Sequence, residues 1–135
     1  MKVSLVALIG ILMALNAFGG QLKDDYELQD KCHKLSDQFY TDYFKDKKGV
    51  VYSLNKNHYN TNLNACFIYV EERYKVVKGT KRYDVNRLIN MDNKKLIGVL
   101  TCVPNSMKIN ECYVADKKCK SVNEFRKLIK PYMEE

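Results

Sequence analysis

Residues 66–76, CFIYVEERYKV, alternate between two sets of side chains with a period of two, which is the period of a β-strand. The first set is mostly apolar and includes Cys66, Ile68, Val70, Tyr74 and Val76. The second set mixes aromatic with charged side chains and consists of Phe67, Tyr69, Glu71, Arg73 and Lys75. The pattern predicts a strand with one face on the core and the other toward solvent.

Three further strands are predicted after this one. A turn at Lys78-Gly79 leads to a strand over residues 83–91, and Asp92-Asn93 has the composition of a two-residue hairpin loop. Residues 95–103 are apolar on both faces, as in a central strand, and a last strand spans about residues 107–114. Because the connections are short, consecutive strands are expected to pair antiparallel.

A helix is predicted on each side of these strands. Over residues 26–46 apolar side chains recur at spacings of three and four, and residues 47–49, KKG, supply the exit. The apolar face of this helix consists of Cys32, Leu35, Phe39, Tyr43 and Phe44. The second helix begins after Ser121, which forms a capping box with Glu124. Pro131 is expected to end or kink it.

The predicted fold class is therefore α+β: an N-terminal helix, a four-stranded antiparallel meander and a C-terminal helix, joined by disulfides. The Asn-rich residues 50–64 are interpreted as a structured loop. An antiparallel sheet can leave one face in water, so both helices are expected on the same face. No linker-like stretch interrupts residues 20–135, which are expected to form one domain.

Residues 1–19 have the features of a secretory signal peptide. Lys2 precedes an apolar run over residues 3–17, and small residues follow where a peptidase would cut, after Ala17 or Gly19. The run is shorter than the roughly 20 residues of a membrane span, which disfavours the alternative of a retained anchor. No cysteine precedes Cys32, so a lipoprotein is not expected. We expect a periplasmic or secreted product.

Five cysteines in a small exported domain predict disulfides, because that compartment is oxidising. Two bridges among five cysteines can be drawn in fifteen ways. Cys112 and Cys119 flank a short connection that can turn back on itself. Cys32 and Cys66 lie on the predicted core faces of the first helix and first strand. These pairs are preferred, and Cys102 is then a buried free thiol.

The motifs of common enzyme classes are absent from the sequence. There is no Gly-rich phosphate loop, Gly-x-Ser-x-Gly elbow, His-Glu-x-x-His or Cys-x-x-Cys, and we expect neither a catalytic site nor a cofactor or metal. Glu71 and Glu72 point to opposite faces of a strand and are expected in solvent. A hydrolase that pairs His58 with a free cysteine is the catalytic alternative.

A protein-binding face is the preferred functional hypothesis, as in an inhibitor or immunity protein. The expected face mixes aromatic, basic and amide side chains and comprises Asn57, His58, Tyr59, Asn60, Phe67, Tyr69, Arg73 and Lys75. The same aromatic residues would also serve as a second packed layer. A net charge of +7 leaves a polyanion or membrane surface as an alternative partner. No sequence-specific nucleic-acid binding is expected, and we expect a monomer.

Several short motifs resemble those of small exported bacterial proteins of uncharacterised function. The shared residues are Cys32, then HYN-x-x-L-x-x-CF over 58–67, C-x-V over 112–114, C-x-S-x-x-EF over 119–125 and PYM over 131–133. The resemblance implies export and a framework of paired cysteines, and it implies no activity. Cys102 does not belong to the shared pattern.

Overall fold

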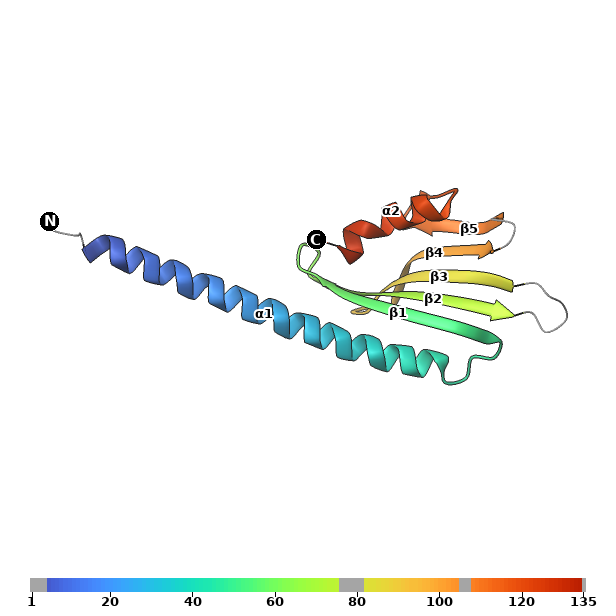
Figure 1. The fold of residues 1–135 in the computed structure, drawn as a ribbon, viewed down its shortest axis with the longest axis horizontal. Coiled ribbons are helices and arrows are strands. Elements are labelled where there is room, and N and C mark those ends of the chain that lie inside the picture. Colours follow the sequence, from blue (N-terminus) through green and yellow to red (C-terminus); the bar gives the residue numbers. More distant parts are fainter. Residues whose placement is uncertain (1–4, 76–81, 105–107, 135) are drawn as a thin grey trace.

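The computed structural model describes the backbone of residues 5–75, 82–104 and 108–134, with side chains from residue 23 onward. It is an α+β fold in which two helices flank one antiparallel sheet (Figure 1). The elements in chain order are α1 (Leu5–Phe44), β1 (Val50–Asn60), β2 (Ala65–Lys75), β3 (Arg82–Asn90), β4 (Lys95–Val103), β5 (Lys108–Val114), β6 (Lys117–Lys118) and α2 (Val122–Met133).

The sheet is a meander of six strands in the order β1-β2-β3-β4-β5-β6, and not of four. β1 is the main addition: the Asn-rich stretch expected to be a loop pairs with β2 from Val50 to Asn60. β-Propensity depends on context, and an edge strand tolerates polar residues that a central strand does not. β6 adds two residues after a tight turn that includes Ala115 at a φ of 53°.

The connection between β3 and β4 lies at the expected position. The β3–β4 turn covers Met91 to Lys94, which makes it longer than the expected two-residue loop, and Lys94 has a φ of 56°. Asn93 Oδ1 accepts a hydrogen bond of 2.9 Å from the backbone N–H of Lys95 and stabilises this turn. The turn predicted at Lys78-Gly79 lies outside the described residues.

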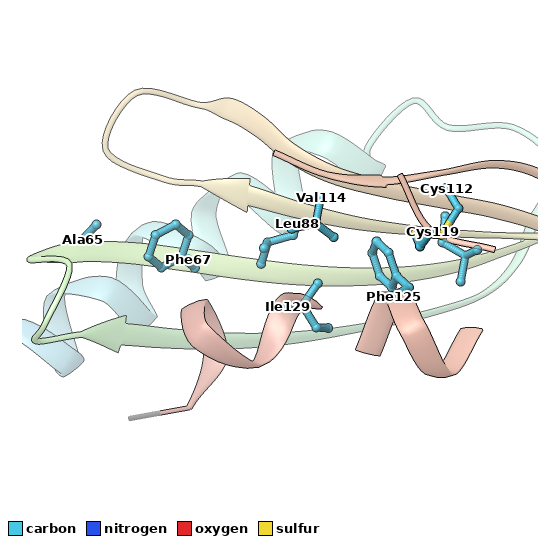
Figure 2. Close-up of a cluster of buried hydrophobic side chains, with 9 residues drawn as sticks. Ala65, Phe67, Leu88, Cys112, Val114, Cys119, Phe125 and Ile129 are labelled. Atoms are coloured by element: carbon cyan, nitrogen blue, oxygen red, sulfur yellow. A yellow bond between two sulfur atoms is a disulfide. The ribbon is translucent and has the colours of Figure 1, made fainter. Parts of the chain in front are cut away.

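The helices pack on opposite faces of the sheet, so the prediction that they share one face is wrong (Figure 1). On the α1 side, one buried cluster consists of Cys32, Cys66, Ile68, Val70, Ile89 and Met91. On the α2 side, the other consists of Ala65, Phe67, Leu88, Leu100, Cys112, Val114, Cys119, Phe125 and Ile129 (Figure 2). Both faces of β2 are therefore buried along its first half.

α1 packs on the sheet only through its C-terminal part, and its N-terminal part extends beyond the sheet (Figure 1). Residues 5–19 of the predicted signal peptide form part of this extension. Cys32 and Ser36 are fully buried, whereas Leu35 is 37% exposed, which corrects the predicted apolar face. The Ser36 hydroxyl lies beside Cys66 Sγ, so a small polar residue allows the helix to approach β2. No helix in the described part of the chain is long and apolar enough to cross a membrane.

α2 begins at the predicted N-cap. The Glu124 backbone N–H donates to Ser121 Oγ at 3.1 Å, and the Glu124 carboxylate accepts from the N–H of Lys120, one residue earlier than expected. The helix passes through Pro131 and ends at Met133. Figure 2 shows Phe125 and Ile129 directed from α2 toward the sheet.

Both predicted disulfides are present. Cys32–Cys66 joins α1 to β2 across a sequence separation of 34, and Cys112–Cys119 joins β5 to the segment that precedes α2. Cys102 is reduced and buried. Each helix is thus fastened covalently at its own face of the sheet, because Cys119 lies two residues before the N-cap of α2.

Candidate groove between the sheet and the second helix

A groove of about 500 Å³ lies between the β1–β2 hairpin and α2. Its sheet side is lined by Leu54, Lys56, Asn57, His58, Tyr69 and Glu71, and its helix side by Arg126, Ile129, Lys130, Met133 and Glu134. Two residues of the predicted binding face, His58 and Tyr69, are therefore brought together here, whereas Asn57 contributes to the groove although its side chain is bonded to α1. The side chains on the helix side were not predicted, because they come from an element far away in the sequence.

The groove carries more positive than negative charge. Lys130 pairs with Glu134 at 3.4 Å along α2. Lys56 and Arg126 are exposed and have no ion-pair partner among the described residues, and Glu71 is half-buried. An anionic group in the groove would meet two unpaired cations, the Lys130–Glu134 pair and the Glu71 carboxylate.

Tyr69 forms part of the groove floor. Its hydroxyl donates a hydrogen bond of 2.5 Å to Asn86 Oδ1 on β3. Burial raises the pKa of the Tyr69 phenol well above its usual value, so this group stays a neutral hydrogen-bonding group at any physiological pH. The ring is half-buried and is held in one orientation, which is typical of an aromatic residue that supports a surface from beneath.

Arg73 lies farther along the same face, where its guanidinium binds the Asp84 carboxylate through Nε at 2.9 Å and Nη2 at 3.3 Å. Its guanidinium carbon is 5.8 Å from the centre of the Tyr52 ring. The register places Tyr52, Arg73, Asp84 and Cys102 in one row across β1 to β4. Within this row Tyr52 is 46% exposed, whereas Cys102 is buried.

Asn57 and Tyr59 mainly face α1 and not the predicted binding face. Asn57 Oδ1 accepts from Gln29 at 3.1 Å, and Asn57 Nδ2 lies 3.0 Å from His33 Nδ1. Tyr59 packs beside the Cys32–Cys66 cluster, and its hydroxyl donates to Asn64. These contacts give both residues a structural role in positioning α1 against β1.

Asn60 and Phe67 are buried, and the prediction that they are exposed on a binding face is wrong. Asn60 Nδ2 donates to the Pro131 carbonyl at 3.1 Å, and its Oδ1 accepts from the Leu63 N–H. Phe67 is 3% exposed and meets the Tyr132 ring edge-on at 5.3 Å. Both sit beneath the end of α2. Lys75 is exposed at the end of β2, away from the groove.

A buried charged cluster on the α1 side was not predicted. Glu72 was expected in solvent but has no exposed surface. Its carboxylate accepts from Lys47 Nζ at 2.7 Å and from the Tyr74 hydroxyl at 2.7 Å, and it pairs with Arg87. Lys47 also lies 3.4 Å from the centre of the Tyr43 ring. The even-numbered residues of β2 face α1. The alternation that places Ile68 and Val70 in the core therefore also places Glu72 on the buried face.

Burial changes the protonation behaviour of this cluster. It lowers the pKa of the Lys47 ammonium and raises the pKa of the Tyr74 phenol to about 12. Tyr74 stacks on Tyr83 with ring centres 4.8 Å apart. The cluster is packed between α1 and the sheet, so we assign it to holding these elements together.

The register separates the two groups that the catalytic alternative requires. His58 lies in the row of Phe67 and Asn90, whereas Cys102 lies in the row of Tyr52. Six residues along β1 separate these rows, which corresponds to about 20 Å at roughly 3.3 Å per residue. His33 lies on α1, on the opposite side of the sheet. Burial also raises the pKa of the Cys102 thiol, which disfavours the thiolate.

The described residues contain no group of three or more His, Cys, Asp or Glu side chains arranged to hold a metal ion. Comparison of the chain with family models, with curated proteins and with solved structures found no match.

Proposed function

We propose that this protein is an exported, non-catalytic module that binds another protein through the α2 side of its sheet. The observation that carries the proposal is the exposure of three large apolar side chains within four residues of β1. Val51 is 56% exposed, Tyr52 46% and Leu54 38%, and Leu54 lines the groove beside α2. Apolar side chains gathered on one exposed strand are typical of an interaction surface.

The framework beneath this surface supports a binding role. Disulfides fasten both helices to the sheet, and Arg73 and Tyr69 are fixed by bonds to Asp84 and Asn86. A surface whose side chains are already ordered loses little conformational entropy when a partner binds. Two disulfides also agree with maturation in an oxidising compartment.

The proposal is tested by capturing partners from envelope and extracellular fractions with three forms of the protein. They are the wild type, Tyr52→Ala/Leu54→Ala, and the matched control Tyr26→Ala/Leu63→Ala. The control removes a tyrosine and a leucine that are 75% and 49% exposed elsewhere on the molecule. We expect the wild type and the control to retain the same protein and the β1 variant to lose it.

Identical partner lists for all three forms would contradict the assigned surface. If the partner were a polyanion, its affinity would fall steeply as the salt concentration rises, because counterions are released when phosphates or sulfates are neutralised. An interaction built on Tyr52 and Leu54 is expected to change little between low and physiological salt.

A further inference from the structure

We propose that the outer edge of β1, over Ser53–Asn57, binds a short extended segment of the partner by β-strand addition. The geometry and charge point to a segment with an apolar and an acidic residue two positions apart, on the same face of the added strand. This inference rests on the proposed function, since it names the binding mode and the chemistry of the partner at the same surface.

β1 is an edge strand with outward-facing backbone groups. The Tyr59 N–H donates to Gln29 Oε1 on α1 at 2.8 Å, so this amide points away from β2. Amide directions alternate along a strand, and the β1–β2 register is continuous from Tyr52 to Asn60. The amides of Ser53, Asn55 and Asn57 therefore point outward as well.

The two ends of this edge are closed, which limits the length of an added strand. A register shift between Val50 and Tyr52 distorts one end, and the Gln29 side chain occupies the amide of Tyr59 at the other. Between them, no described residue forms a hydrogen bond to the N–H of Ser53 or Asn55. The open length suits a segment of about five residues, which is a common strand length.

The side chains beside the open edge specify the chemistry of that segment. Leu54 and Lys56 point to the α2 side and line the groove, and Lys130 faces them from α2. Residues 50–60 contain no Asp or Glu. On an added strand, an apolar side chain would pack beside Leu54. An acidic side chain two positions away, on the same face, would lie next to Lys56 in place of the missing counter-charge.

A second copy of this chain is a poorer occupant of the edge. In an antiparallel β1–β1 pair centred on Asn55, Lys56 lies diagonally across from Lys56 of the other copy, at about 7–8 Å. Neither strand supplies a carboxylate to compensate this repulsion. Lys56 thus disfavours pairing of β1 with a second copy of the chain and favours pairing with an acidic segment.

The test titrates the oxidised full-length protein with the fluorescent seven-residue peptide Thr-Val-Thr-Glu-Thr-Val-Thr, whose valine and glutamate side chains share one face of an extended strand. The controls are the same peptide with lysine in place of glutamate, and a peptide with the glutamate moved by one position, onto the opposite face. We expect the first peptide to bind at least ten-fold more tightly than either control. Amide hydrogen exchange at Ser53 and Asn55 is expected to slow on binding, which docking without strand addition would not cause.

Two variants make the test specific. Asn55→Pro removes one outward N–H without removing a bond to β2, so it is expected to fold and to weaken peptide binding at least ten-fold, whereas Asn55→Ala binds as the wild type. Lys56→Glu is expected to bind the lysine peptide more tightly than the glutamate peptide. If Asn55→Pro does not fold, the peptide preference of Lys56→Glu and the amide exchange of the wild type test the inference instead.

Three results would each overturn the inference. The first is unchanged amide exchange at Ser53 and Asn55 when the peptide binds, and the second is equal affinity for the acidic and basic peptides. The third is a dimer of the free protein in analytical sedimentation. The partner-capture assay separates this result from failure of the proposed function. If Asn55→Pro keeps the captured protein and Tyr52→Ala/Leu54→Ala loses it, strand addition is wrong while the binding role stands. If the β1 variants all retain the same proteins as wild type, the binding surface itself is wrong.

Discussion

The Lys47 ammonium lies 2.7 Å from the carboxylate of Glu72, a residue with no exposed surface. Lys47 follows the last turn of α1, and Glu72 lies in the second half of β2, beyond the Cys32–Cys66 bridge. The ion pair and the disulfide therefore hold α1 to the sheet at two separate positions. With α1 fixed on one face, the other face is left to α2 and to the groove beside it.

Removing the charge of Glu72 is expected to destabilise the fold. Glu72→Gln leaves Lys47 and Arg87 without their buried counter-charge, and breaking such a pair costs about 3–5 kcal/mol. Glu71→Gln is the matched control: it changes the neighbouring, half-exposed carboxylate and is expected to alter stability by less than about 0.5 kcal/mol. Urea unfolding measures both, and equal midpoints for the two variants would contradict the assignment.

The two disulfides are expected to contribute unequally to stability. The chain-entropy estimate gives about 4 kcal/mol for Cys32–Cys66, at a separation of 34, and about 2.5 kcal/mol for Cys112–Cys119, at a separation of 7. Paired Cys→Ser variants of each bridge, compared by denaturant unfolding, test this order. A larger loss from the Cys112→Ser/Cys119→Ser variant would show that chain entropy does not govern the difference.

Cys102 is expected to be an unreactive thiol in the native protein. It is buried, and burial raises its pKa, so the thiolate is scarce at neutral pH. Titration with a chromogenic disulfide reagent should modify it slowly in buffer and rapidly in denaturant. Fast modification of the native protein at pH 7 would instead support a catalytic role for this cysteine.

Stability is expected to fall as the pH rises from about 10 toward 12. Tyrosine in an unfolded chain has a pKa of about 10, whereas Tyr74 in the fold has a pKa of about 12. Between these values the unfolded chain has lost a proton that the folded chain keeps, so the linkage relation favours unfolding as the pH increases. Tyr69, whose pKa is also raised, acts in the same direction.

The lowered pKa of Lys47 acts in the opposite direction below pH 10.5, because there the unfolded chain binds more protons than the fold. Unfolding at a series of pH values, together with phenolate absorbance, separates these contributions. Tyr74→Phe should reduce the loss of stability above pH 10, and an unchanged slope in this variant would contradict the assigned cause.

The sequence predicted the elements whose periodicity is strong and whose ends carry clear signals. β4 begins at Lys95 and ends at Val103 as predicted, and the Ser121 cap of α2 is confirmed. Both cysteine pairs were preferred correctly, because helix and strand periodicity placed Cys32 and Cys66 on core faces. These features depend on neighbours within a few residues, which a single sequence displays directly.

The features that were missed depend on contacts between distant residues. The stretch 50–60 begins with the β-forming residues Val50, Val51 and Tyr52, but the Asn residues that follow disfavour a strand. Its pairing with β2 and its contacts with α1 decide the outcome. Phe67 and Tyr69 were placed on an outward face because the position of α2 above them follows from tertiary packing. Glu72 was expected in solvent because its partners Lys47 and Arg87 lie far from it in sequence.

A binding role outside the cytosol requires that the chain is exported and matures where thiols oxidise. Intact-mass analysis of the protein isolated from its natural source, with a non-reducing peptide map, tests this most directly. We predict a chain that begins just after residue 17 or 19, with Cys32 linked to Cys66, Cys112 linked to Cys119 and one alkylatable thiol at Cys102. A cytosolic chain that still begins at Met1 and carries five reduced cysteines would contradict it.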